Sequence, residues 1–496
     1  MMRQLCRTGI MLAVAMLALM ALADPPPGER PNLGPSRITQ EQVAAGNLNL
    51  NQLRDAGMRV FTTPFNKLDG YGDGPMDVGD TVSPGGRPTL GGNGTLLRVN
   101  GLDGQSCLEC HSILSNATIP PRLGIGGVGG SVTNAMIKPT AMDPADLENF
   151  DSIADFNGRF ANPPFIFGAG AVELLAIEMT QDLLAQRDWA IQNPGSVVEL
   201  TSKGIGFGTI VADAIGQLDT SQIHGVDEDL IVKPFGRKGE FPTTRDFDIE
   251  AMQFHFGMQP VEIFGENTDP DGDGVVNEIM IGELSALHVF VSSSAKPEQK
   301  TATAATVRGF NVFVEVGCAS CHVPQLQTSA EELPLRFPMD HADPQANVYY
   351  RVDLTKTPAK FDKNGQGGLV VPLFADLKRH EMGEGLAETF ALASEQRNRE
   401  FTTARLWGIA DTGPYLHDGR ATTLSEAILL HGGEAEQVRN EFAALADLQK
   451  EELLGFLRTL VTPVEPSNRG SSPGVRGNVG FVRGTPLRTF GPTDPD

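Results

Sequence analysis

The feature that most limits how this chain can fold is a pair of identical five-residue motifs. Residues 107–111 and 318–322 both have the pattern Cys-x-x-Cys-His. Two thiols at this spacing can reach the two vinyl groups of one porphyrin, and the histidine that follows can bind the iron. The pattern is typical of c-type haem attachment. We therefore predict two covalently bound haem c groups, held by Cys107, Cys110, His111, Cys318, Cys321 and His322.

The remaining cysteine does not weaken this interpretation. The 496 residues contain five cysteines, and Cys6 is the only one outside the two motifs. A zinc site would need its four ligands in one cluster, whereas the motifs are about 200 residues apart in the chain. A thioredoxin-like redox pair would need a βαβ context, which is not visible. Two disulfides would leave both motif histidines unexplained.

The first 23 residues have the pattern of a secretory signal peptide. Arg3 and Arg7 precede an apolar run over residues 9–22, and Ala21 and Ala23 form a small-residue cleavage site. The run is shorter than the roughly 18 residues that a membrane span requires. An uncleaved anchor is the alternative. We expect export to the periplasm, with no membrane span after cleavage.

The charge of the exported chain limits its partners. Without Arg3 and Arg7, 37 basic residues face 62 acidic ones, so the net charge is −25. A nucleic-acid binder normally has the opposite sign. A small soluble c-type cytochrome with a basic surface is the electron donor that this charge would attract.

Apolar spacing predicts helices over residues 38–60, 171–192, 247–256, 282–292, 306–316 and 448–460. A helix directly before the second motif and another near the end of the chain are the plan of a cytochrome c domain. The 56 glycines and 34 prolines indicate long loops. We expect a mainly α fold with two cytochrome-c-like haem domains and long Gly/Pro-rich loops. The expected boundaries are 1–23 for the signal peptide, 24–300 and 301–465 for the haem domains, and 466–496 for a flexible tail.

Four segments resemble a known family, namely residues 254–259, 376–383, 405–409 and 413–435. They are similar to the di-haem oxidoreductase, putative peroxidase family, which is related to the bacterial di-haem cytochrome c peroxidases and to di-haem maturation enzymes. The resemblance extends over most of the exported chain and is densest at residues 245–290 and 305–460. It implies two cytochrome-c-like domains, one haem for electron entry and one for peroxide chemistry.

The far side of the second haem has three candidate ligands. Residues 423–426 form a capping-box pattern that predicts a short helix ending at His431. In the peroxidases that this chain resembles, the residue closing the corresponding helix is the distal methionine, and in the maturation enzymes it is a tyrosine. We rank His431 first, then Met382 and His380. A surface histidine at a helix end is the alternative for His431.

The far side of the first haem has His255 as its candidate ligand and Met258 as runner-up. A histidine on an apolar helix face is often only a core residue, but the resemblance favours a ligand. His255 could instead be the acid/base group above an open iron, and Glu262 is a second acid/base candidate. Trp407 could lie between the haems or simply be a buried core residue. Arg420, with His417, could hold haem propionates, or it could be a surface arginine.

A calcium-like loop follows at residues 269–280. Asp269, Asp271 and Asp273 occupy positions 1, 3 and 5 of a calcium loop, and Asn277 occupies position 9. Position 12 is Met280 in place of the usual glutamate, so Glu278 or Glu283 would have to substitute. A plain acidic turn is the alternative to a bound Ca²⁺ ion.

The sequence thus predicts a periplasmic di-haem c-type oxidoreductase of the peroxidase type. Electrons are expected to pass from the C-terminal haem to the N-terminal haem, where peroxide is reduced. The alternative is a di-haem c-type electron-transfer protein without peroxidase chemistry.

Overall fold

The computed structural model describes residues 28–72, 74–77, 79, 104–111, 141–143, 155–157, 162–388 and 394–463. The expected signal peptide and C-terminal tail lie outside these residues. The described residues belong to one compact unit that ends at Val464, and the expected boundary at residue 300 stays a prediction. Within the described part of the chain, no helix combines the length and the apolar character that crossing a bilayer requires.

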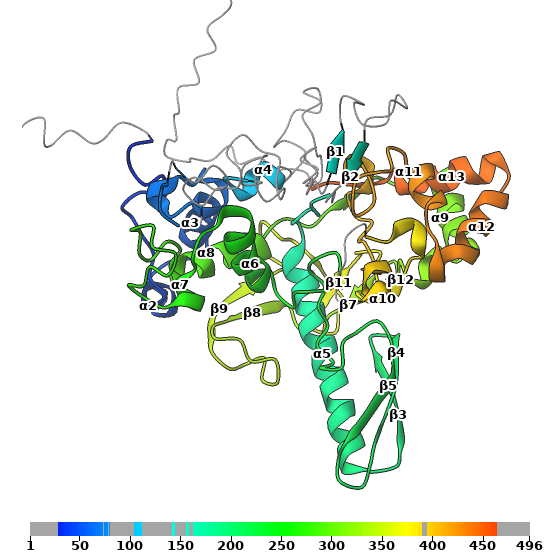
Figure 1. Ribbon diagram of the computed structural model, residues 1–496. Coiled ribbons are helices and arrows are strands. Elements are labelled where there is room, and N and C mark those ends of the chain that lie inside the picture. Colours follow the sequence, from blue (N-terminus) through cyan, green and yellow to red (C-terminus); the bar gives the residue numbers. More distant parts are fainter. Residues whose placement is uncertain are drawn as a thin grey trace, which may run out of the picture. The chain divides into compact units, whose positions relative to one another are not determined.

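Helices of very different length alternate with loops along the described chain (Figure 1). They are α2 (Gln40–Ala44), α3 (Leu50–Thr62), α4 (Cys107–Cys110), α5 (Ala169–Gln192), α6 (Thr244–Phe256), α7 (Val261–Phe264), α8 (Ile281–Ser292), α9 (Ala304–Val316), α10 (Glu395–Arg399), α11 (Leu424–Leu429), α12 (Glu436–Ala444) and α13 (Asp447–Leu457). Short 3-10 turns occur at Lys67–Asp69, Cys318–Ser320, Glu384–Leu386, Ile409–Asp411 and Gly433–Ala435.

All six helices expected from apolar spacing are present, and one of them is divided. The segment 38–60 forms α2 and α3, which are separated by Gly46 with a φ of 68°. Asn49 caps α3, because its side chain accepts a hydrogen bond from the amide of Gln52 and the Gln52 side chain accepts one from the amide of Asn49. A left-handed glycine followed by a cap residue marks the end of one helix and the start of the next. The apolar spacing alone does not show this break.

Small antiparallel sheets accompany the helices. Two of those in the described part of the chain have three strands. The first has the strand order β3 (Val197–Ser202), β4 (Ile205–Ala212), β5 (Leu218–Ile223), and the second has the order β10 (Asp362–Lys363), β11 (Leu369–Val371), β7 (Leu326–Gln327). The two-stranded pairs are β1 (Ala141–Asp143) with β2 (Asp155–Asn157), β8 (Glu332–Arg336) with β9 (Val348–Asp353), β12 (Arg379–Glu381) with β13 (Glu400–Thr402), and β14 (Leu460–Val461) with β6 (Glu298–Gln299). Helices and sheets thus occur together, and the expectation of a mainly α chain describes only the helical part.

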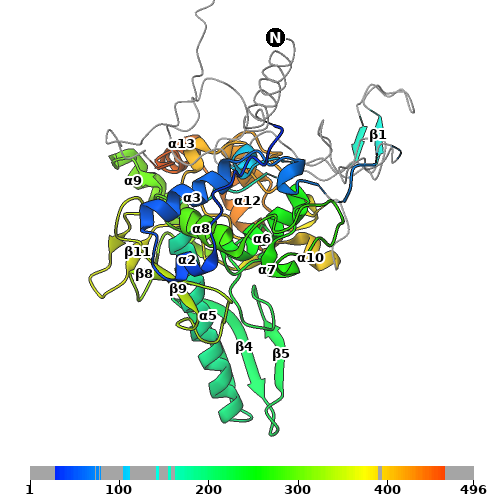
Figure 2. The same ribbon diagram turned by 90° about the vertical axis from the view of Figure 1, so that its left-hand side faces the viewer.

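The sheet β3–β4–β5 was not expected. Its strands alternate between buried and exposed residues, and the β3–β4 turn contains Lys203 and Gly204, both with positive φ. The C-terminal half of α5 runs alongside this sheet in both views (Figures 1 and 2). This alternation and the glycine-containing turn are the sequence pattern of a β-hairpin.

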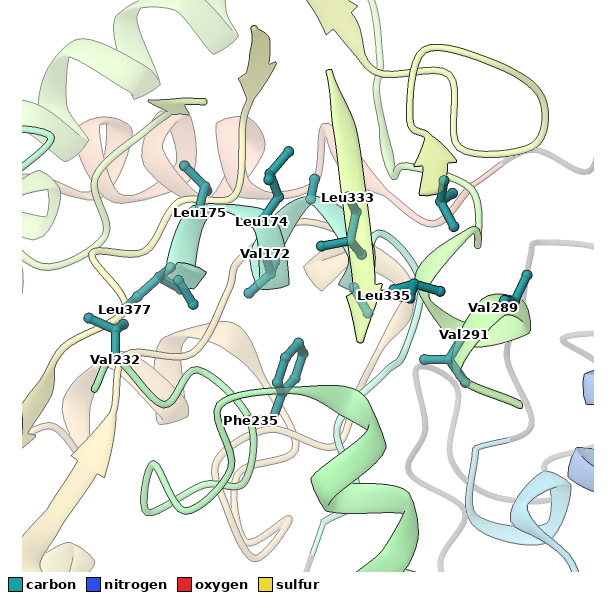
Figure 3. Close-up of a cluster of buried hydrophobic side chains, with 14 of the residues drawn as sticks. Val172, Leu174, Leu175, Val232, Phe235, Val289, Val291, Leu333, Leu335 and Leu377 are labelled. Atoms are coloured by element: carbon teal, nitrogen blue, oxygen red, sulfur yellow. The ribbon is translucent and has the colours of Figure 1, made fainter. Parts of the chain in front are cut away.

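The main hydrophobic core forms where α5, β8 and α8 meet. Figure 3 shows Leu333 and Leu335 of β8 among side chains of α5 such as Val172 and of α8 such as Val289. The first half of α5 is buried nearly all round, as expected of a helix enclosed by other elements. This core supports α8 and the α6 helix packed on it, whose Phe247 lies 6.3 Å from His111 of the first motif.

A second core lies beside the second motif and is built by α9, α12 and α13. Phe310 and Phe313 of α9 pack against Phe456 of α13 with ring centroids 5.2 Å and 5.5 Å apart, and Phe374 joins them. The backbones approach closely, because a Cβ atom built on Gly309 would lie only 1.9 Å from the carbonyl oxygen of Glu452. Only glycine fits at this crossing.

This crossing gives a stability prediction. Gly309→Ala should lower the free energy of unfolding by about 1–3 kcal/mol, because the added methyl group must push α9 and α13 apart. Gly455→Ala in α13 is the matched control, since a Cβ there meets nothing within 4 Å. It should be neutral or stabilising by up to about 1 kcal/mol. Chemical denaturation of the two variants checks this, and equal midpoints would contradict the close packing.

Candidate haem and calcium sites

The first motif forms the single helical turn α4. On one turn, residues three apart lie on the same face, so both thiols face one side. The segment before the motif is held by backbone and side-chain hydrogen bonds, from the amide of Phe65 to Gln105 and from the hydroxyl of Tyr71 to the carbonyl of Gly104 (2.9 Å). All four motif cysteines are free thiols that are partly buried, so the disulfide alternative finds no support.

His111 is oriented by one hydrogen bond. Its Nδ1 atom lies 2.7 Å from the carbonyl oxygen of Pro164. A carbonyl can only accept, so Nδ1 must carry the proton and Nε2 is left with its lone pair. Burial lowers the pKa of His111 to about 4, and the ring is therefore neutral at neutral pH. A neutral imidazole with a free Nε2 is the form that binds a metal.

His322 of the second motif has the same arrangement. The motif begins directly after α9 through Gly317, whose φ of 103° turns the chain. Nδ1 of His322 lies 3.1 Å from the carbonyl oxygen of Phe374. Burial, and then the neighbouring His431, lowers the pKa of His322 to about 4. Each motif thus presents a neutral imidazole in which Nδ1, and not Nε2, bonds the carbonyl of Pro164 or Phe374.

His431 lies beside His322, as its ranking as the far-side ligand requires. The two ring centroids are 6.4 Å apart. Two imidazoles on opposite sides of one metal, with bonds of about 2 Å and rings about 1 Å in radius, would have centroids about 6 Å apart. Nδ1 of His431 lies 2.8 Å from the carbonyl of Ala427, one turn back, so its Nε2 also keeps the lone pair. The donor set fits a haem iron between two histidines.

The helix that carries His431 differs slightly from the expected one. The α11 helix ends at Leu429, two residues before His431. Thr423 caps it by accepting from the amide of Glu426, but the Glu426 carboxylate accepts from Thr422 in place of Thr423. The predicted capping box is therefore only half formed.

His380 is committed to an ion-pair network. Its Nε2 lies 2.8 Å from Asp376 and its Nδ1 lies 2.7 Å from Glu434. Burial opposes the charge, but hydrogen bonds to Asp376 and Cys321 raise the pKa of His380 to about 11. A protonated ring with both nitrogens paired has no lone pair for iron. Met382 lies close to the chain at Gly432, where a Cβ would be 2.9 Å from the Met382 carbonyl, and it remains the second candidate.

The end of α6 adjoins the first motif. His255 lies in the last turn of α6, and Phe247 of the same helix lies 6.3 Å from the His111 ring. Phe254 lies 5.1 Å from the His255 ring. Glu262 forms an ion pair with the buried Arg245 at 2.7 Å. The roles of His255 and Glu262 stay predictions.

One acid near the first motif was missed by the sequence analysis. Asp248 of α6 is 9% exposed, and its Oδ2 atom has no hydrogen-bond partner among the described residues. Burial raises the pKa of Asp248 well above its usual value. Burial also raises the pKa of the Cys107 thiol, with a smaller contribution from Asp248. The signal was present, since an aspartate stands inside the apolar segment 247–256.

Trp407, Arg420 and His417 occupy different environments. Trp407 is 2% exposed, and its indole N–H has no acceptor among the described residues. It packs beside Gly168 and lies 6.3 Å from Phe361. Arg420 pairs with Asp418 at 2.5 Å and is partly exposed, while His417 stacks on Phe401. A buried donor without an acceptor fits a missing polar partner such as a propionate, whereas Arg420 already has a protein partner.

The predicted calcium loop brings its acids together. Oxygen atoms of Asp269, Asp271 and Asp273 lie within 4.8 Å of one another. The side-chain oxygen of Asn277 accepts from the amide of Asn267 at 2.8 Å. Burial, and then the charges of Asp271 and Asp273, raises the pKa of Glu278 to about 8. The three aspartates thus converge as predicted, and Glu278 follows them in the loop as a fourth, buried acid.

Comparison with solved structures gives matches of low similarity. Hydrazine synthase from Kuenenia stuttgartiensis, studied under xenon pressure, is 19% identical with a TM-score of 0.23, and the match covers 43% of this chain and 60% of that chain. A MauG-like protein associated with microbial copper homeostasis is 14% identical with a TM-score of 0.27, covering 62% of this chain and 93% of that chain. None of the curated proteins matches this chain.

A family model matches the part of the chain that follows the second motif and contains the residues packed around it. The matched segment begins at the last residue of β10 and ends at the first residue of β14, so it contains Phe374, His380, Trp407 and His431. It lies within the part of the chain where the resemblance was expected to be densest. The resemblance is confirmed there: residues 363–460 match the family described as "Di-haem oxidoreductase, putative peroxidase".

Proposed function

We propose that this chain is a periplasmic di-haem c-type oxidoreductase that reduces peroxide. One observation carries the proposal. Each Cys-x-x-Cys-His motif presents a neutral histidine whose Nδ1 is fixed by a backbone carbonyl, and the His431 ring stands 6.4 Å from the ring of His322, a separation that suits two ligands of one iron. One closed and one accessible iron is what a di-haem peroxidase needs. The family match of residues 363–460 supports an oxidoreductase.

The chain's own residues have distinct tasks in this proposal. When bound, the haems supply iron that exchanges electrons and, at one of them, a face for peroxide. His111 and His322 hold the irons from one side. His431 closes the far side of the second haem, which restricts that haem to electron transfer. Cys107, Cys110, Cys318 and Cys321 form the covalent links.

Proton movement is the task of the acids and histidine near the first motif. Reduction of one peroxide consumes two electrons and two protons and gives two water molecules. Cleavage of the O–O bond requires a proton to move between the two oxygens, so a positioned acid/base group is needed. His255 and Glu262 are the candidates from the sequence. Asp248 joins them because it is buried with one carboxyl oxygen unpaired, and because burial raises its pKa well above the usual value.

Trp407 and the surface charge bear on electron delivery. We propose that electrons enter at the second haem and pass to the first. The buried Trp407 would lie between the two haems in this proposal, and its unpaired N–H could serve a haem propionate. Arg420, tied to Asp418, is the weaker propionate candidate. The donor in this proposal is a small basic c-type cytochrome, which the net charge of −25 would steer toward the exported chain.

The second candidate function is a di-haem electron carrier. The position of His255 at the end of α6, the helix whose Phe247 lies 6.3 Å from the His111 ring, favours it. If His255 binds the first iron permanently, both irons have two histidine ligands and no face remains for peroxide. The two candidates therefore differ in a single property, which is whether the first haem opens.

Covalent attachment can be tested one motif at a time. The double substitution Cys107→Ser with Cys110→Ser should lower the haem content from two to one per chain, because thioether bonds can no longer form at that motif. The matched pair Cys318→Ser with Cys321→Ser should do the same at the other motif. Haem content per chain and the mass of the denatured protein measure this. A wild-type chain without a covalently bound mass would contradict the proposal.

The role of His431 has a spectroscopic prediction. His431→Ala should convert one low-spin ferric signal into a high-spin one, because the second iron loses its far-side ligand. His431→Met should keep it low-spin and raise its reduction potential. The exposed His224 supplies the control His224→Ala, which should leave both signals unchanged. Electron paramagnetic resonance and a redox titration check these outcomes, and an unchanged His431→Ala spectrum would exclude His431 as ligand.

Peroxidase chemistry and simple electron transfer are separated by the wild-type protein. We expect a high-spin ferric signal, either at rest or after half-reduction, and turnover of H₂O₂ with a reduced basic cytochrome. The rate should fall as ionic strength rises, because salt screens the attraction between donor and chain. Two haems that stay low-spin in every redox state, without turnover, would establish the electron carrier instead.

A further inference from the structure

Hydrogen bonds from backbone amides to its own carboxylates fix the conformation of the acidic loop between α7 and α8. Asp269 accepts hydrogen bonds from the amides of Asp273 (3.0 Å) and Gly274 (3.1 Å), and Asp273 accepts from Val275 at 2.7 Å. These bonds turn the loop so that three carboxylates converge. Convergence alone does not show an ion, because acidic turns of this kind also occur without one.

Glu278 provides an independent observation. It is 2% exposed, and its Oε1 atom has no hydrogen-bond partner among the described residues. Its Oε2 atom accepts from the amide of Gln259 at 2.6 Å. The chain at Gly70 covers it so closely that a Cβ there would lie 2.4 Å from Oε2. A buried carboxylate oxygen without a partner is costly, and Asp271 and Asp273 are its charged neighbours.

The charges around this oxygen do not balance. Lys67 contributes an ammonium group, which lies 2.9 Å from Asp273 and 2.5 Å from the carbonyl oxygen of Gly74. One ammonium faces four carboxyl groups, those of Asp269, Asp271, Asp273 and Glu278. Hard oxygen ligands in excess of the local positive charge are the environment that a calcium ion prefers.

We propose that Asp269, Asp271, Asp273 and Glu278 bind one Ca²⁺ ion, with Glu278 in place of the missing acid at position 12. Glu283, the other substitute, is already taken, because Arg37 binds both of its oxygens at 2.6 Å and 2.7 Å. Glu278 has a free oxygen and Glu283 does not. The ligand set is therefore compressed into the first ten residues of the loop.

The site also holds the end of α6. Glu278 accepts from the amide of Gln259, and the amide of Gly72 donates to the carbonyl of Phe256 at 2.8 Å. The amide of Gly74 donates to Asp271 at 2.8 Å. The ion thus tightens a set of bonds around the turn that carries His255. This positioning effect on the first haem rests on the proposed function, whereas the binding of the ion does not.

Calorimetry with Ca²⁺ on the chelator-treated, haem-loaded full chain tests the site. We expect one ion per chain, and we expect Glu278→Gln to weaken binding by about tenfold or more, because ligand charge sets calcium affinity. Asp271→Asn, at a partly exposed position, should weaken it similarly and covers the case in which Glu278→Gln fails to fold. Glu266→Gln is the matched control, since this acid is exposed and lies outside the cluster. No binding, or wild-type affinity in the folded variants, would overturn the proposal.

Hydrogen exchange tests the coupling to α6. Saturating Ca²⁺ should slow exchange of the Gly72, Gly74 and Gln259 amides by about tenfold or more, because opening these bonds would also open the site. The amide of Gly216, in the distant β4–β5 turn, should not change. Equal rates with and without Ca²⁺ would overturn the coupling. Neither measurement uses peroxide, so both results can be interpreted even if the peroxidase proposal fails.

Discussion

The hydrogen bond from each motif histidine to a backbone carbonyl is the interaction on which the rest of the site depends. Pro164 and Phe374 each fix one Nδ1 proton, and this leaves Nε2 with a lone pair. Burial then keeps both rings neutral. The surrounding helices serve this geometry: α9 and α13 enclose one motif, and α6 with α8 adjoins the other. A carbonyl displaced by an ångström would weaken the orientation of the ring and, with it, any iron–nitrogen bond.

Features encoded by local spacing could be predicted from the sequence, and features that depend on distant partners could not. The two motifs, the six helical segments and the convergence of three aspartates all follow from residues within a few turns of one another. The pairing of His380 with Glu434, of Glu283 with Arg37 and of Glu262 with Arg245 joins positions that only the fold brings together. These pairings decide which candidate keeps a lone pair or a free oxygen.

Buried ionisable side chains are paired to different degrees in different parts of the structure. Around the second motif, both nitrogens of His380 are paired, one with Asp376 and the other with Glu434. Asp248 and Glu278, in contrast, are buried acids with an unpaired oxygen each. A buried carboxyl oxygen without a partner is costly, so these two acids are the ones that we expect to bind a proton or an ion.

The crossing of α9 and α13 has a consequence for how the molecule assembles. Gly309 and Glu452 are separated by about 140 residues, whereas Arg37 must find Glu283 across about 250. Closing a longer loop costs more conformational entropy and slows the search. We therefore expect the crossing of α9 and α13 to form before the ion pair of Arg37 and Glu283 closes. The hydrogen bonds that orient the two motif histidines close loops of 53 and 52 residues, so neither motif has the longer search for its carbonyl.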